Sequence, residues 1–183
     1  MSNNQKIISQ VRHWIETVVI GLNLCPFAKS VYRKSKLRYV VSESKGIDAL
    51  MYELYQQCRY LVETPEIETT LLIIPRQLQA FADFNQVLDL VDALIEEYEW
   101  AGVFQIASFH PKYQFANTRL EDRQNWSNRS PFPILHILRE SSVELALSRY
   151  QDPGEIPEVN IAKLEAMDKT EFDHIFNPEN AFK

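Results

Sequence analysis

Two histidines in one polar segment are the residues of this sequence best suited to chemistry. His110 and His136 lie in FQIASFHPKYQFANTRLEDRQNWSNRSPFPILHILR, which runs from Phe104 to Arg139 and also carries Asp122. An imidazole can transfer a proton, bind a metal ion or hold buried polar groups by hydrogen bonds, and a second group can orient it. We therefore predict that His110 is a proton carrier and that Asp122 or His136 orients it. The alternative is that both histidines are structural and are hydrogen-bonded to their surroundings.

The same segment offers a binding site for an anion. Ser130 followed by Pro131 is typical of a helix start, so we predict a helix from Ser130 to about Tyr150. The unpaired N–H groups and the dipole of a helix start favour negative charge, and Arg129 can grip a phosphate or carboxylate through two hydrogen bonds. The competing interpretation is that Ser130 is an ordinary helix cap and binds no ligand.

Three further residues join this predicted anion site. At a spacing of three, His136 and Arg139 share one face of the predicted helix. Asn117 and Asn128 lie in the polar stretch before it and add amide groups. We expect Arg139 and the two asparagines to contribute to ligand binding. In the alternative, the arginines only pair with carboxylates and carbonyls of the loop.

Cys25 is the candidate nucleophile. It follows a predicted helix in GLNLCPFA, and Pro26 disfavours helical geometry at Cys25, so the helix should end just before it. A reactive thiol needs a lowered pKa, which Lys29 or Arg33 could provide. The alternative is a buried, inert thiol, as we expect for Cys58. A metal centre of Cys25 and the two histidines would lack the close spacing of known metal motifs, so we predict no metal site.

The elements that must position these residues alternate between strands and helices. Short apolar runs predict three strands, at residues 37–41, 69–74 and 103–109. Apolar residues at spacings of three and four predict helices before and between these strands. Such alternation favours parallel pairing through right-handed crossovers. We therefore predict an α/β fold, with a small, mainly parallel sheet of about three strands packed by four to five helices.

A break at QDPGEIPEVN divides the sequence into two parts. Residues 1–150 are predicted to form a single α/β domain. Residues 151–183 are predicted to form a C-terminal extension with one short helix, packed on the same domain.

In a parallel sheet, ligands collect beyond the carboxyl ends of the strands, and His110 follows directly after such an end.

The composition excludes several classes of function. The 183 residues have a net charge of −6 and are 45% hydrophobic, so we expect neither nucleic acid nor a membrane as partner. With four glycines and no nucleotide-binding fingerprint, the sequence identifies no cofactor. No apolar run is long enough to span a membrane, and the first residues do not resemble a signal peptide. We therefore expect a cytoplasmic protein.

Three motifs, NLCPFA (23–28), FHP (109–111) and NRSPFPILHILRE (128–140), carry a family resemblance. Together they resemble a family of bacterial proteins of about this length that is labelled only as a domain of unknown function. The resemblance covers nearly the whole chain and implies no particular reaction, ligand or cofactor. It does link Cys25 to the 108–139 segment, so we expect these two regions to meet in one pocket.

These observations favour an enzyme that acts on a small anionic substrate, a phosphate or a carboxylate, by acid–base or nucleophilic chemistry. Two alternatives use the same residues. The protein could be a non-catalytic module that binds an anionic metabolite or a protein partner. The loop at residues 110–130 could instead be a structural polar plug, held by hydrogen bonds of its Asn, Asp and Arg side chains.

Overall fold

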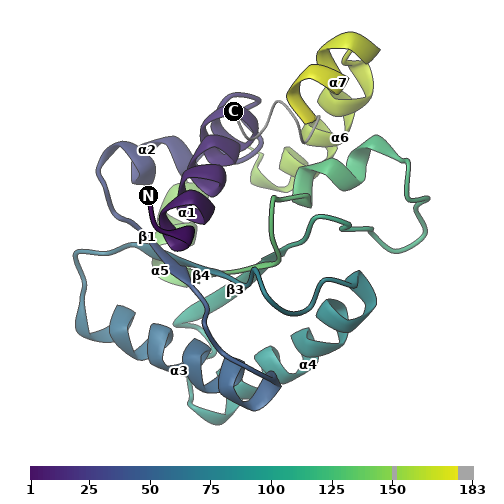
Figure 1. The fold of residues 1–183 in the computed structure, drawn as a ribbon. Coiled ribbons are helices and arrows are strands. Elements are labelled where there is room, and N and C mark those ends of the chain that lie inside the picture. Colours follow the sequence, from purple (N-terminus) through teal and green to yellow (C-terminus); the bar gives the residue numbers. More distant parts are fainter. Residues whose placement is uncertain (150–151, 177–183) are drawn as a thin grey trace.

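A four-stranded sheet separates two layers of helices in the computed structural model, which describes residues 1–149 and 152–176 (Figure 1). The strands are β1 (Leu37–Val41), β2 (Thr69–Ile73), β3 (Phe104–Phe109) and β4 (Ile134–Arg139). Their order across the sheet is β1-β2-β4-β3. The three strands predicted from the sequence are confirmed, and the protein is a mixed α/β fold.

The prediction of a mainly parallel sheet is wrong, because a fourth strand separates two of the predicted ones. Only β1 and β2 pair in parallel within the described residues, whereas β4 pairs antiparallel with both β2 and β3. β1, β2 and β3 therefore run in the same direction, as their helical connections require, but β4 lies between β2 and β3.

The helix predicted from Ser130 to Tyr150 is also wrong over its first half. Residues 134–139 form β4, and the helix α5 (Glu140–Leu147) begins only afterwards. Ser130 caps no helix, because its Oγ donates a hydrogen bond to the carbonyl of Phe132 at 2.6 Å. The run ILHIL is apolar on both faces of the strand, so it lacks the alternation that distinguishes a strand from a buried helix. Tyr150 lies outside the described residues.

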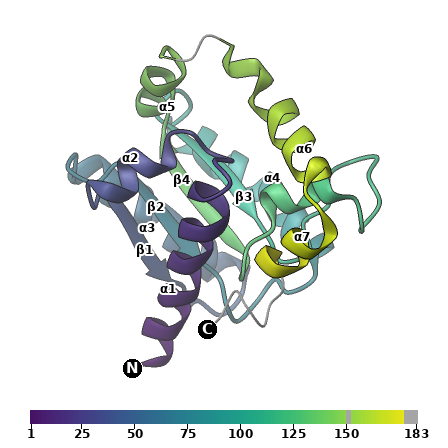
Figure 2. The ribbon, with the colours of Figure 1, turned by 90° about the horizontal axis from the view of Figure 1, so that it is seen from above.

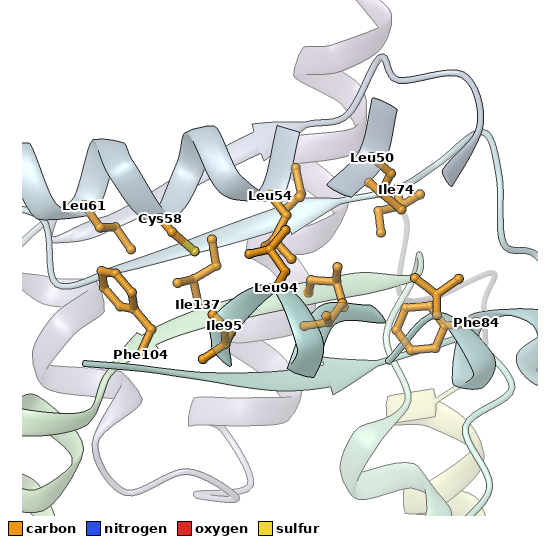
Figure 3. Close-up of a cluster of buried hydrophobic side chains, with 14 residues drawn as sticks. Leu50, Leu54, Cys58, Leu61, Ile74, Phe84, Leu94, Ile95, Phe104 and Ile137 are labelled. Atoms are coloured by element: carbon orange, nitrogen blue, oxygen red, sulfur yellow. The ribbon is translucent and has the colours of Figure 1, made fainter. Parts of the chain in front are cut away.

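Two long helices cover one face of the sheet and form one of the two hydrophobic cores with it (Figure 3). They are α3 (Ile47–Glu63), which follows Gly46, and α4 (Phe81–Glu97). Leu54 and Cys58 of α3 and Phe84 of α4 have no exposed surface. Each such side chain contributes roughly 2 kcal/mol through removal of its apolar surface from water. These side chains therefore serve the core between the helices and the sheet.

The other face carries shorter helices, which leave part of the sheet uncovered by backbone. α1 (Asn3–Trp14) begins with a capping box between Ser2 and Gln5 and continues into a π-helix, η1 (Ile15–Ile20). α2 (Ala28–Arg33) follows and buries none of its residues fully. Figure 2 shows α1 lying across the sheet, with α2 beside it and α5 near the end of β4. Within the described residues, no helix is long and apolar enough to cross a membrane.

The C-terminal part packs on the same face through two helices, where the sequence predicted one. A short turn, η3 (Pro153–Glu155), leads into α6 (Ile156–Ala166) and α7 (Lys169–Phe176). Leu164 is fully buried, and the Arg123 guanidinium donates to the carbonyls of Leu164, Glu165 and Met167. Arg123 belongs to a 3-10 helix, η2 (Arg123–Asn128). The predicted boundary at residues 150 and 151, and residues 177–183, lie outside the described residues.

Candidate functional site

A cavity of about 250 Å³ lies over the open face of the sheet. Its walls come from α1 and η1, from the segment Cys25–Val31 with α2, and from α5. Its floor is the centre of the sheet, where His136 of β4 lies between Leu71 of β2 and Ala107 of β3. The sequence predicted a site beyond the carboxyl ends of the strands, but this cavity lies over the face of the sheet.

The lining of the cavity is almost entirely apolar. Its aromatic and aliphatic side chains come from every wall and are Trp14, Ile15, Val19, Phe27, Ala28, Val31, Leu37, Leu71, Ala107, Phe109, Leu138, Val143 and Ala146. Cys25, Glu68, Thr69, His136, Arg139 and Ser142 complete it. A concave, mostly apolar space with a few polar groups is the usual form of a small-molecule site.

A threonine on the neighbouring strand fixes the tautomer of His136. Thr69 Oγ1 lies 2.6 Å from His136 Nε2 and also 2.6 Å from the carbonyl oxygen of Ile137. A carbonyl only accepts, so the single hydroxyl proton of Thr69 must point to Ile137. The short contact with His136 is then a hydrogen bond only if Nε2 donates. The neutral imidazole therefore carries its proton on Nε2, and Nδ1 keeps its lone pair.

His136 is uncharged at neutral pH. Burial among apolar side chains disfavours the imidazolium and lowers the pKa of His136 to about 4. The ring still retains some accessible surface, because His136 lines the cavity. At neutral pH it is thus a polar but uncharged group on the floor of an apolar space.

Cys25 reaches the same cavity from the end of the first helix. The π-helix closes with a hydrogen bond from Leu24 N to Val19 O, and Asn23 then takes a left-handed conformation with φ 51°. The backbone N–H groups of Phe27 and Ala28 hydrogen-bond to the Cys25 thiol and favour its ionised form. Burial has the larger effect, however, and it raises the pKa of Cys25 above its ordinary value. The thiol is therefore protonated at neutral pH.

His110 lies apart from this cavity. It has no exposed surface and packs between the rings of Phe81 and Phe84, at centroid distances of 5.4 and 5.2 Å. Its Nε2 bonds to the carbonyl of Leu78 at 3.0 Å, and its Nδ1 accepts from the backbone N–H of Lys112 at 2.9 Å. Burial lowers the pKa of His110, so the ring is neutral at pH 7. Both ring nitrogens are engaged by the backbone.

Backbone carbonyls of the loop engage Arg129. Its Nε donates to Tyr113 O at 3.2 Å, its Nη2 donates to Leu120 O at 2.6 Å, and its guanidinium lies over the Trp126 ring at 4.5 Å. Desolvation by burial lowers the pKa of Arg129, with an opposing effect of the Glu121 charge. Arg129 and Ser130 do not line the cavity.

The other predicted site residues of the loop either form hydrogen bonds with backbone groups or take a turn conformation. Asn128 Nδ2 donates to Ser108 O at 3.2 Å, and Asp122 Oδ2 accepts from the Arg119 N–H at 2.8 Å. Asn117 takes a left-handed conformation, with φ 63°. None of Asn117, Asp122 and Asn128 lines the cavity.

Arg139 and Glu68 stand where the cavity meets the end of β4. The Arg139 guanidinium donates to the carbonyls of Leu61, Thr64 and Ile67 and so closes the C-terminal end of α3. Glu68 accepts from Ser142 Oγ at 2.6 Å and pairs with Lys36 at 3.0 Å. The Ser142 and Lys36 hydrogen bonds lower the pKa of Glu68 against the effect of burial, so its carboxylate is ionised at neutral pH.

The structure thus brings together three of the predicted site residues, Cys25, His136 and Arg139. His110 lies on the side of α4, and the remaining predicted residues lie in the loop before β4. Among the described residues, no three His, Cys, Asp or Glu side chains lie close enough to hold a metal ion.

Residues 6–174 match the family described as "Protein of unknown function (DUF1415)". The chain belongs to this family. The match confirms the expected resemblance to a family of unknown function, and its range includes every residue that lines the cavity. No curated protein and no solved structure shows a significant match to the chain.

The sequence did not predict the hydrogen-bond partner of His136 or the aromatic residues that line the cavity. Thr69 was assigned only to a buried strand, although a threonine in a fully buried run signals a hydrogen-bond partner. Trp14 and Phe109, which meet edge to face at 5.3 Å beside the cavity, were not among the predicted site residues. No signal in one sequence distinguishes an aromatic ring that lines a cavity from one in a core.

Proposed function

We propose that the protein binds a small, uncharged and largely apolar molecule in the cavity over the sheet. The observation that carries this proposal is the lining itself, which is apolar on every wall and has the Thr69–His136 pair on its floor. Burying a ligand there removes apolar surface from water, at about 25 cal/mol per Å². The polar pair adds orientation without adding charge.

The charges around the cavity support an uncharged ligand. The ionised Glu68 that lines it is paired with Lys36, and the Nε and Nη2 groups of Arg139 donate to backbone carbonyls, so both charged side chains already have partners. A desolvated ion needs a partner to offset its lost hydration, and this lining offers few. Both cysteines are free thiols, which supports action in a reducing compartment such as the cytoplasm.

An enzyme that acts on a small anionic substrate is the second candidate. The observation that favours it is that Cys25 and His136, a possible nucleophile and a possible base, line the same cavity. In this candidate, ligand binding would have to promote loss of the Cys25 proton, since burial raises the pKa of the thiol. The loop at residues 110–130 then acts as the polar plug that holds β3 and β4 in place.

Binding of two matched probes separates the candidates. We would titrate the protein with 4-ethylanisole, which is neutral, and with the carboxylate 4-ethylbenzoate, and follow backbone amide shifts by NMR. The proposal predicts that the neutral probe shifts amides around Trp14, Ala107 and Val143. Stronger binding of 4-ethylbenzoate at these positions would favour the anionic substrate instead.

A pair of tryptophan variants on α5 provides the control. Val143 lines the cavity, whereas Leu145 on the same helix is 58% exposed and does not. Val143→Trp should fill the space and weaken binding of 4-ethylanisole at least tenfold, and Leu145→Trp should leave it unchanged. Equal affinity of both variants, or no binding to the wild-type protein, would contradict the proposal.

A further inference from the structure

His110 and His136 differ in how many of their ring nitrogens form hydrogen bonds within the protein, and this difference bears on what the cavity can bind. His110 uses both ring nitrogens in hydrogen bonds with the backbone. His136 uses Nε2 alone, and within residues 1–149 and 152–176 no protein group donates to its Nδ1. A histidine that is only structural would be expected to satisfy both nitrogens, because a buried acceptor without a donor is costly.

The Nδ1 atom of His136 is not sealed inside the protein. Among the described residues, the buried side-chain atoms without a hydrogen-bond partner are Trp14 Nε1, Tyr39 Oη and Thr70 Oγ1. Nδ1 is not one of them, although it also has no protein partner, so it must keep accessible surface. His136 is on a central strand and lines the cavity, so this surface opens into the cavity.

We propose that Nδ1 of His136 accepts a hydrogen bond from the ligand, which is therefore an apolar molecule with a hydroxyl or N–H group. The inference rests on the proposed function and names the chemical class of its ligand. Thr69 is a positioning residue in this account. The oxygen of Thr69 accepts a hydrogen bond from Nε2–H, and this bond keeps the imidazole proton on Nε2 and off Nδ1.

The same arrangement selects against other ligands. A molecule that presents only an acceptor, such as an ether or a ketone, meets another lone pair at Nδ1 and leaves both unpaired. A carboxylate only accepts hydrogen bonds, so it meets the same lone pair at Nδ1 and gains no partner there for its lost hydration. A hydroxyl on an apolar body satisfies Nδ1 and buries the rest of the molecule against the lining.

The test compares 4-ethylphenol with its methyl ether, 4-ethylanisole, on the wild-type protein and on His136→Phe. The two probes share an apolar body, but only the phenol donates a hydrogen bond. We expect the wild-type protein to bind the phenol about threefold to tenfold more tightly, the range that a neutral hydrogen bond provides. His136→Phe should bind the two probes with equal affinity.

A second measurement does not depend on the folding of any variant. Nitrogen-15 NMR of the wild-type imidazole should show the proton on Nε2, and the Nδ1 resonance should move on addition of 4-ethylphenol but not of 4-ethylanisole. A proton on Nδ1 would overturn the inference. So would equal affinity of the wild-type protein for both probes, which would leave the proposed function intact. Absence of binding by either probe would remove the proposed function and this inference with it.

Thr69 supplies a matched pair of variants. Thr69→Val keeps the shape but removes the oxygen that engages Nε2, so the imidazole can place its proton on Nδ1. The preference for 4-ethylphenol over 4-ethylanisole should fall to below twofold. Thr69→Ser restores the oxygen and should restore the preference. A preference that survives in Thr69→Val would show that Thr69 does not fix the tautomer.

Discussion

At the scale of single residues, burial decides the protonation of the groups at the cavity. It lowers the pKa of His136 to about 4 and raises that of Cys25, so both groups are neutral at pH 7. Glu68 stays ionised because Ser142 and Lys36 hydrogen-bond to it. Cys25 and His136 therefore bring no charge to the cavity, and the charge of Glu68 is already paired with Lys36.

The buried imidazole makes stability depend on pH. His136 has a lower pKa folded than unfolded, so the unfolded chain binds more protons between about pH 6.5 and pH 4. The free energy of unfolding should fall as pH is lowered through this window, by on the order of 3 kcal/mol from His136 alone. Urea unfolding at pH 7 and pH 4.5 measures the fall.

His136→Phe isolates this contribution, because His110 is also neutral and buried and remains in both proteins. Cys25 and Glu68, the titratable groups that share the cavity with His136, remain as well. The variant should lose less stability than the wild-type protein between pH 7 and pH 4.5. Equal losses would show that His136 titrates at its ordinary pKa.

The Cys25 thiol should react slowly. Because burial raises its pKa, little thiolate is present at pH 7, and alkylation by iodoacetamide should be slower than that of a small thiol such as glutathione. The rate should rise up to a higher pH than for the small thiol. Mass spectrometry separates Cys25 from Cys58. Fast alkylation of Cys25 at pH 7 would instead support the nucleophile of the second candidate.

At the scale of elements, the loop before β4 is held by hydrogen bonds from its own side chains. Arg129 joins two of its carbonyls and covers Trp126. Asn125 is fully buried, accepts from Phe115 N and Thr118 Oγ1, and donates to Arg119 O. These bonds hold the chain between β3 and β4, whereas the pairing of β4 with β2 and β3 sets the register that places His136 on the floor of the cavity.

Removal of Arg129 should therefore destabilise the fold without altering the cavity. Arg129→Ala leaves the carbonyls of Tyr113 and Leu120 without this donor and should cost about 1–3 kcal/mol. Arg119→Ala, an exposed arginine of the same loop, is the control and should cost less than about 0.5 kcal/mol. Chemical denaturation measures both. Weakened binding of 4-ethylbenzoate by Arg129→Ala, with unchanged stability, would instead support an anion site.

The sequence predicted the elements with a local pattern and missed the one without it. β1, β2 and β3 follow from short apolar runs between turn signals, and α3 and α4 from spacings of three and four. β4 could not be recognised, because Ile134, Leu135 and Ile137 are buried on both faces of the sheet. Its pairing with β2 and β3 is a long-range property that no local pattern contains.

The candidate site was predicted in part for the same reason. Cys25 and His136 were selected by residue type, and their meeting in one cavity was expected from the family motifs. His110, Arg129 and Asn128 were selected as well, but their hydrogen bonds are with the backbone. The type of a residue shows what it can do, whereas only the fold shows which of its polar atoms are already engaged.

At the scale of the whole molecule, the C-terminal helices share a hydrophobic core with the sheet. Leu164, Met167, Phe172 and Phe176 pack with α1, β2 and β4 in the second core. Lys163 and Asn160 of α6 donate to the carbonyls of Leu22 and Leu24, next to Cys25. The C-terminal helices therefore support the cavity wall from outside.

A substitution in α6 should consequently lower the stability of the whole fold. Leu164→Ala removes a fully buried side chain and should cost about 2–5 kcal/mol. Val159→Ala, on the same helix but 53% exposed, should cost less than about 1 kcal/mol. Thermal unfolding followed by circular dichroism and tryptophan fluorescence should give one shared transition. A separate early transition in Leu164→Ala would show that the extension unfolds independently.

A crystal structure of the protein grown with 4-ethylphenol would show directly whether the cavity binds a ligand through His136. We expect the probe in the cavity between α1, α2, α5 and the sheet, with its ring against Trp14 and Leu71 and its hydroxyl on Nδ1 of His136. A probe bound elsewhere, or side chains that fill the cavity and leave no space for it, would contradict the central claim.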